Sequence, residues 1–116
     1  MSVNSIIKTA LQPLIPNPDP ATPTVTADIY KGTAREYITF NYTELPELHA
    51  EGKPNIIRYL IQIHWWLPLK TSITAKKKQI KNALKNAGFT YPSVVNASDG
   101  DGQHYVFECE VFDGDV

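Results

Sequence analysis

The clearest pattern in the chain is a strict alternation of residue types near its middle. Arg58, Gln62 and His64 lie at alternate positions, and apolar or aromatic residues lie between them. Successive side chains of a strand point to opposite faces, so a period of two predicts a strand with one buried face. The buried face is expected to carry Ile57, Tyr59, Ile61, Ile63, Trp65 and Leu67.

A lysine-rich amphipathic helix is predicted after this strand. Pro68 blocks continuation of the strand, and Thr71, Ser72 or Thr74 can cap the helix. Apolar residues at helical spacing predict the side that is buried. This stripe consists of Ile73, Ile80, Leu84 and Ala87.

The same helix carries its own stop signal. Gly88 can adopt the left-handed conformation of the residue just past a helix end. Phe89 follows at the position from which a side chain folds back onto Leu84. The helix is therefore expected to stop at Ala87.

An amino-terminal helix is expected after Ser2, whose hydroxyl can cap it. Pro13 and Pro16 end this helix. The four prolines of residues 16–23 then predict a stiff, extended connector, which joins elements of one domain or forms an arm. The apolar stripe of the helix is Val3, Ile6, Ile7, Ala10, Leu11 and Leu14.

Two alternating segments follow the connector. Residues 25–29 predict a short strand, residues 35–43 predict a second one, and a hairpin is expected over residues 31–34. Residues 44–54 contain two prolines, a glycine and three glutamates, which together predict an exposed loop. The second strand is expected to place Ile38, Phe40 and Tyr42 on one face and Tyr37, Thr39 and Asn41 on the other.

Two more strands are expected near the carboxyl-terminal end. The first covers residues 93–96, and the glycines and aspartates of residues 98–102 favour a tight reversal after it. The last strand alternates again. One of its faces carries Tyr105, Phe107, Cys109 and Val111, and the other carries His104, Glu108 and Glu110.

The expected order is helix, two strands, long strand, helix, two strands. Most connections are short, which favours antiparallel pairing, and strands outnumber helices. The predicted fold class is α+β: an antiparallel or mixed sheet of about four to five strands with two helices packed mainly on one face. A length of 116 residues suits a single domain over residues 1–116.

Composition narrows the class of protein. Apolar residues make up 42% of the chain and charged residues 20%, as in globular proteins. No apolar run approaches the roughly 18 residues of a membrane span. Residues 1–8 lack the basic start and apolar core of a signal peptide, so a cytoplasmic protein without membrane partners is expected.

Charge is unevenly distributed, although the formal net charge is only −1. Five of the eleven Lys and Arg residues lie in residues 76–85, whereas residues 99–115 are mostly acidic. Lys77, Lys81 and Lys85 form an i, i+4, i+8 stripe, which nucleic-acid-binding helices also show. Such a stripe is more often the solvated side of an amphipathic helix, and the chain as a whole is not basic.

No set of residues in the sequence fits a metal site. Asp99 and Asp101 resemble part of a calcium loop, but the third oxygen ligand and the distal glutamate are absent, so a turn is favoured. His49, His64 and His104 lie in a loop and two different strands without the close spacing of metal ligands. We therefore assign no metal-binding residues.

No catalytic or cofactor-binding residues are assigned either. The lone Cys109 is expected to be a small buried thiol, and no serine or cysteine has the surroundings of an activated nucleophile. Glu108 and Glu110 lie about 7 Å apart on one strand face, which suits a solvated or interface pair as well as an acid pair. The sequence offers no cofactor motif.

Three segments resemble the tail completion proteins of long-tailed bacteriophages and prophages, which are also called tail terminator or head-tail joining proteins. These segments are Tyr37–Tyr42, Arg58–Trp66 and Lys78–Phe89. The resemblance extends over roughly residues 35–112, with the amino-terminal helix in the expected place. The proline-rich connector and the end of the long strand at residues 65–68 have no counterpart that can be mapped.

This resemblance implies a non-enzymatic structural protein of the virion tail, made in the cytoplasm of a bacterial host. Family members are small α+β proteins that form rings, commonly hexamers, and cap the finished tail tube. The implied partners are other copies of the chain, the major tail tube protein and a head-completion or connector protein. The alternative is a small nucleic-acid-binding module that uses the lysine-rich helix over residues 76–85.

Overall fold

The computed structural model describes residues 2–48 and 54–112. Two α-helices, one short 3-10 helix and five strands follow one another in the described chain, in the order expected from the sequence. Their bounds are α1 (Val3–Leu11), η1 (Gln12–Leu14), β1 (Val25–Ala27), β2 (Tyr37–Leu48), β3 (Pro54–Leu67), α2 (Thr74–Asn86), β4 (Ser93–Asn96) and β5 (Gln103–Phe112).

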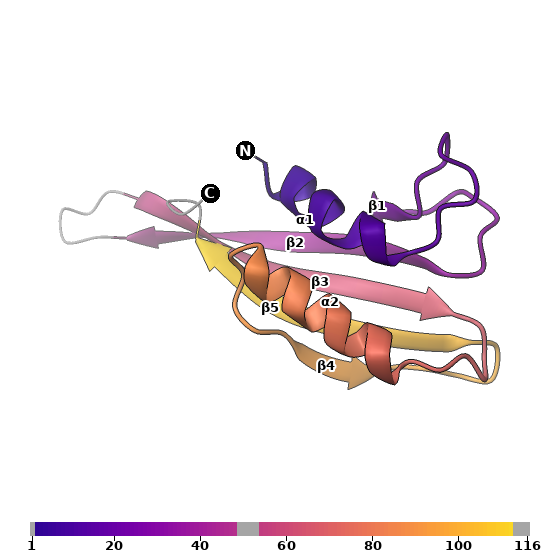
Figure 1. Cartoon of the computed structure of the whole chain (residues 1–116). Coiled ribbons are helices and arrows are strands. Elements are labelled where there is room, and N and C mark those ends of the chain that lie inside the picture. The colour runs from indigo at the N-terminus through magenta and orange to yellow at the C-terminus, as the bar shows by residue number, and fades with distance from the viewer. Residues whose placement is uncertain (1, 49–53, 113–116) are drawn as a thin grey trace.

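The five described strands form one mixed sheet in the order β1-β2-β3-β5-β4. The last four pair antiparallel with their neighbours, and β1 adds to the edge of β2 in parallel. Figure 1 shows α1 and α2 on the same side of the sheet. This arrangement confirms the predicted fold class.

The hydrophobic core lies between one face of the sheet and the two helices. Ile7 and Leu11 of α1 and Ile80 and Leu84 of α2 meet the buried strand residues there. The alternation along the sequence identified the buried face of each long strand correctly. The buried strand residues of β2, β3 and β5 are Ile38, Phe40, Ile61, Ile63, Trp65, Leu67, Tyr105, Phe107, Cys109 and Val111.

The amino-terminal helix α1 begins as expected, with the Ser2 hydroxyl accepting a hydrogen bond from the Ser5 N–H. Gln12 holds the far end of the proline-rich connector, since its amide donates to Thr24 Oγ1 at 2.9 Å and accepts from the Val25 N–H at 3.1 Å. The connector joins η1 to β1. A turn closed between Asp19 and Thr22 interrupts the extended path that its prolines predicted.

The helix α2 ends as the sequence predicted. Gly88 has a φ of 104°, in the left-handed region. The Phe89 N–H donates to Leu84 O, and the Gly88 N–H donates to Lys85 O, each at 3.1 Å. These bonds form a Schellman motif and bring Phe89, which is 2% exposed, into the core.

The predicted N-cap of α2 is wrong. Ile73 occupies the cap position and makes no side-chain cap hydrogen bond. Its carbonyl accepts the Lys77 N–H at 2.8 Å, while its side chain packs against the core. Packing of the isoleucine therefore places the helix start, rather than the capping preference of Thr71, Ser72 or Thr74.

The hairpin predicted over residues 31–34 is also wrong, because β1 and β2 are parallel, with Val25 opposite Ile38. Asp28 turns the chain with a φ of 64°, and the chain then returns to begin β2 beside β1. Ile29 lies outside β1 and is 66% exposed. A short parallel strand and a hairpin strand show the same alternation, so the pattern did not distinguish them.

Residues 44–48, predicted to be loop, belong to β2 and pair with β3. The β2–β3 hairpin therefore continues well beyond residues 38–40, where β1 ends, and Figure 1 shows it projecting past both helices. Pro46 fits because β2 is an edge strand there and a proline can turn its missing N–H to the free side. The centre of the predicted loop, residues 49–53 with His49, lies outside the described residues.

Candidate functional site on the open face of the sheet

The second face of the sheet is covered by no helix of the described chain, and we call it the open face. The strand positions that alternate with the core residues point to it. Rings gather at one end of this face, and carboxylates lie toward the other. Its residues are Tyr37, Thr39, Asn41, Thr43, Leu45, Arg58, Leu60, Gln62, His64, Trp66, Ser93, Val95, His104, Val106, Glu108, Glu110 and Phe112.

Four rings, which we call the aromatic row, cross one end of the open face. Trp66 lies opposite Tyr37 on β2 and opposite His104 on β5. The Trp66 and His104 rings stack with centroids 3.7 Å apart, and the Tyr37 ring lies 6.0 Å from Trp66. Tyr30 extends the row by stacking on Tyr37 at 4.5 Å. All four rings are half-buried, and a continuous set of partly exposed rings is typical of a contact surface.

Two of the histidines meet beside the aromatic row. Nδ1 of His64 lies 2.9 Å from Nε2 of His104, a hydrogen bond in which one ring donates and the other accepts. Partial burial lowers the pKa of both rings below 6.5, and the nearby charges of Glu108 and Asp99 oppose this shift. The spacing of the histidines along the chain does not predict this contact, because only the pairing of β3 with β5 brings the two rings together. The one signal in the sequence is that His64 and Trp66 share a strand face.

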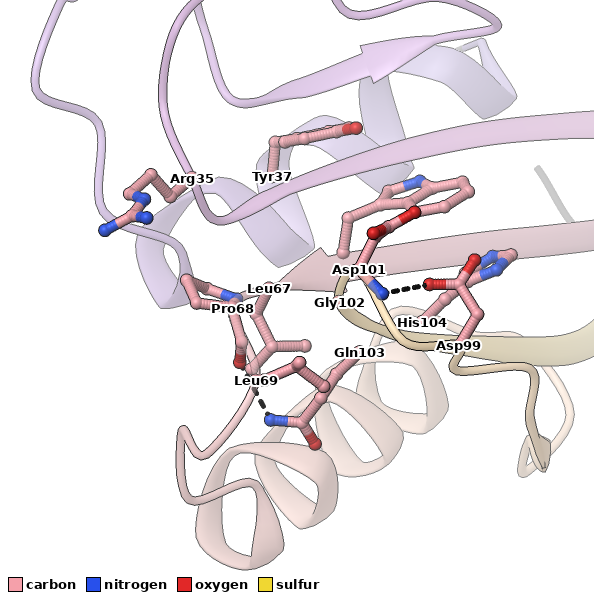
Figure 2. A pocket seen from close by; sticks show the side chains of 11 residues that line it. Arg35, Tyr37, Leu67, Pro68, Leu69, Asp99, Asp101, Gly102, Gln103 and His104 are labelled. Carbon is pink, nitrogen blue, oxygen red and sulfur yellow. Dashed lines mark hydrogen bonds between the residues drawn. The ribbon is translucent and has the colours of Figure 1, made fainter.

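A hollow of about 650 Å³ lies at the end of the aromatic row. Figure 2 shows Arg35 on one side of it and the turn with Asp99 and Asp101 on the other. The Asp101 N–H donates to Asp99 Oδ1 at 2.8 Å, so the tight reversal predicted for residues 98–102 is confirmed. Gln103 also lines the hollow, and its side-chain amide N–H donates to Pro68 O at 3.0 Å.

Glu108 and Glu110 lie on the open face of β5, as predicted. They border a second open hollow, of about 510 Å³, which Asn41, Gln62 and other polar side chains also line. The backbone of Glu110 is held by Thr90, whose Oγ1 accepts the Glu110 N–H at 2.9 Å. This part of the open face offers acceptors for cationic or hydrogen-bonding groups.

Neither Ser98 nor Cys109 has its side-chain oxygen or sulfur bonded to the histidine rings. The Ser98 hydroxyl accepts the His104 backbone N–H at 2.9 Å and does not bond to the histidine rings. Cys109 points into the core, where burial raises the pKa of its thiol to about 12. Within the described residues, no group of three or more His, Cys, Asp and Glu side chains is placed to hold a metal ion.

The helix α2, which carries the predicted lysine stripe, lies across the sheet from the open face (Figure 1). Within the stripe, Lys77 and Lys81 are half-buried, and Lys81 lies over the Tyr91 ring at 5.7 Å. Lys76 is engaged, because its Nζ lies 3.0 Å from Glu36 Oε2. Lys78 and Lys85 are exposed and form no ion pair with any described residue. These two lysines are therefore available for a partner.

In the part of the chain that the structure describes, neither helix has the length and apolar character that crossing a membrane requires.

The chain matches no protein-family model and no curated protein. The resemblance to tail completion proteins therefore depends on residues 37–42, 58–66 and 78–89 alone.

Proposed function

We propose that this chain is a ring-forming tail terminator of a long-tailed bacteriophage or prophage. Rings of this protein would cap the finished tail tube and provide the surface that joins the tail to the head. The proposal rests on the resemblance of residues 35–112. The α+β class agrees with the fold that this resemblance implies.

The structural observation that best supports this proposal is the uncovered sheet face with its aromatic row. Trp66, Tyr37 and His104 together present rings that a monomer would leave in contact with water. A protein that works by stacking on copies of itself or on a tube needs such broad, shallow surfaces and no closed pocket. The β2–β3 hairpin, which projects past the helices, provides a further surface for reaching a neighbour.

A tube-length assay tests the proposal. The major tail tube protein of the same phage or prophage would be polymerised with and without the purified chain, and tube lengths would be measured by electron microscopy. We expect shorter tubes with a ring of density at one end. Unchanged lengths together with no binding to tubes would contradict the proposal, and salt-dependent DNA binding by the isolated subunit would favour the alternative module.

A matched pair of variants relates the assay to the open face. Val95 and Ile29 are both exposed apolar residues, at 52% and 66%, but only Val95 lies on the open face. We expect Val95→Asp to weaken ring formation or tube capping, because it places a charge in the contact surface. Ile29→Asp serves as the control and is expected to behave like the wild type.

A further inference from the structure

We propose that three lysines of α2 in one copy, of which Lys78 and Lys85 are exposed and Lys81 is half-buried, dock on the open face of the next copy. We call Lys78, Lys81 and Lys85 the lysine face. This proposal rests on the proposed function in one respect, since ring assembly is what supplies a second copy as the occupant. It adds the two surfaces that meet.

Charge complementarity is the first reason. Glu108 and Glu110 border a polar hollow on the open face. Asp99 and Asp101 border the other hollow, at the end of the open face where the aromatic row lies. Arg58 lies on the open face, where it already has an interaction of its own, and Arg35 borders the hollow beside the aromatic row. The lysine face carries only positive charge. Opposed patches of this kind orient two partners and suppress like-with-like pairing.

Size is the second reason. The 13 residues of α2 make a helix about 20 Å long at 1.5 Å per residue. The stretch of β5 from His104 to Glu110 is also about 20 Å long at 3.4 Å per residue. A helix laid along β5 would therefore reach from the aromatic row to the glutamates. The apolar stems of its lysines would cover the rings, while their ammonium groups reach the carboxylates.

The positions of the two surfaces are the third reason. Both helices lie on one side of the sheet and the open face lies on the other (Figure 1). A subunit of a ring touches its two neighbours through different surfaces on roughly opposite sides. Contact between the lysine face and the open face is of this heterologous kind, and it can be repeated from copy to copy until the ring closes.

A pair of charge-reversed variants tests the inference. The helix variant carries Lys78→Glu and Lys85→Glu, and the sheet variant carries Glu108→Lys and Glu110→Lys. Each variant alone presents like charges on both surfaces, so we expect its self-association to weaken by about tenfold or more. A 1:1 mixture restores opposite charges at every contact, because acidic helices meet basic sheets and basic helices meet acidic sheets. An alternating ring with an even number of subunits should form.

Sedimentation velocity at low ionic strength would measure the self-association of the helix variant, the sheet variant and their mixture beside the wild type. Melting curves would show that each variant is folded. Lys8→Glu is the control, since Lys8 is exposed and lies on α1, away from the two surfaces. If only the mixture assembles like the wild type, the inference holds. It is overturned if either variant assembles alone as the wild type does, if the folded variants stay apart on mixing, or if the wild type remains a monomer at every concentration.

The tube-length assay separates this inference from the proposed function. If the mixture assembles but neither it nor the wild type caps tubes, the docking stands and the terminator role fails. If the wild type caps tubes but mixing the variants restores nothing, the terminator role stands and the docking fails. Loss of DNA binding in the helix variant, without any change in its self-association, would also overturn the docking and assign the lysines to nucleic acid.

Discussion

At the scale of single residues, Gly88 shows how one backbone angle limits what the sequence can be. Its φ of 104° lies in a region where residues other than glycine are strained, and no atom would lie within 4 Å of an added Cβ. The cost of Gly88→Ala is therefore backbone strain alone. We expect the free energy of unfolding to fall by about 1–2 kcal/mol.

Urea unfolding would measure this change, and Gly100→Ala is the matched control. Gly100 also has open space around an added Cβ, but its φ is not positive. The control is expected to unfold like the wild type. Equal effects of the two substitutions would show that the left-handed conformation of Gly88 is not what destabilises the variant.

The histidine pair leads to a prediction about pH. Burial lowers the pKa of His64 and His104 in the folded chain, whereas in the unfolded chain both return to about 6.5. Below that pH the unfolded chain binds more protons than the folded one. The stability that the two neutral histidines contribute is therefore expected to be fully present above about pH 6.5. It is lost as the pH falls below that value, so the free energy of unfolding decreases on acidification.

Urea titrations at about pH 7.5 and about pH 5.5 would measure this effect in the wild type and in a variant with His64→Gln and His104→Gln. We expect the wild type to lose more stability than the variant between the two conditions. The prediction would be contradicted if the wild type became more stable on acidification, or if it lost no more stability than the variant between the two pH values.

At the scale of elements, Glu36, which directly precedes β2, joins β3 to α2. Its Oε2 accepts the Nε1–H of the fully buried Trp65 at 2.9 Å, and the same carboxylate pairs with Lys76 of α2. Glu36→Ala would leave the buried indole N–H without its acceptor and should cost about 1–3 kcal/mol.

Glu36→Gln separates the hydrogen bond from the ion pair. The amide oxygen can still accept from Trp65, so only the partly exposed pair with Lys76 is lost, and the expected cost is below about 1 kcal/mol. Chemical unfolding of both variants would measure the difference. If Gln costs as much as Ala, the ion pair and not the indole hydrogen bond holds α2 against the sheet.

Much of the element structure could be predicted because it depends on neighbouring residues. The alternation of β2, β3 and β5 revealed their buried faces, and Gly88 with Phe89 revealed the end of α2. The strand order and the β3–β5 register depend on pairings between residues some forty positions apart, such as Trp66 with His104. The aromatic row exists only through that register, and this is why the sequence did not predict it.

The two wrong assignments in the first half of the chain have a similar cause. Pro46 and its acidic neighbours have the composition of a loop, yet an edge strand accepts them, because no described strand pairs with β2 on that side beyond Phe40. The parallel pairing of β1 follows from the turn at Asp28, whose positive φ is uncommon for an aspartate. Local composition favoured the commoner structure in both places.

At the scale of the whole molecule, assembly through the lysine face and the open face should depend on salt. Exposed charges are screened beyond about 10 Å at 0.1 M salt and beyond about 3 Å at 1 M. We expect the assembled fraction to fall between about 0.05 M and about 0.5 M sodium chloride at constant protein concentration. Light scattering after size exclusion would measure it, and assembly that strengthens with salt would point to an apolar contact instead.

The neighbouring residues Trp65 and Trp66 point to opposite sides of the sheet, one sealed in the core and the other on the open face. The molecule therefore contains two fluorescent probes that report different events. In a Trp65→Phe variant, emission from Trp66 should shift to shorter wavelength when a neighbour covers the open face. In a Trp66→Phe variant, emission from Trp65 should stay constant through assembly and change only when the chain unfolds.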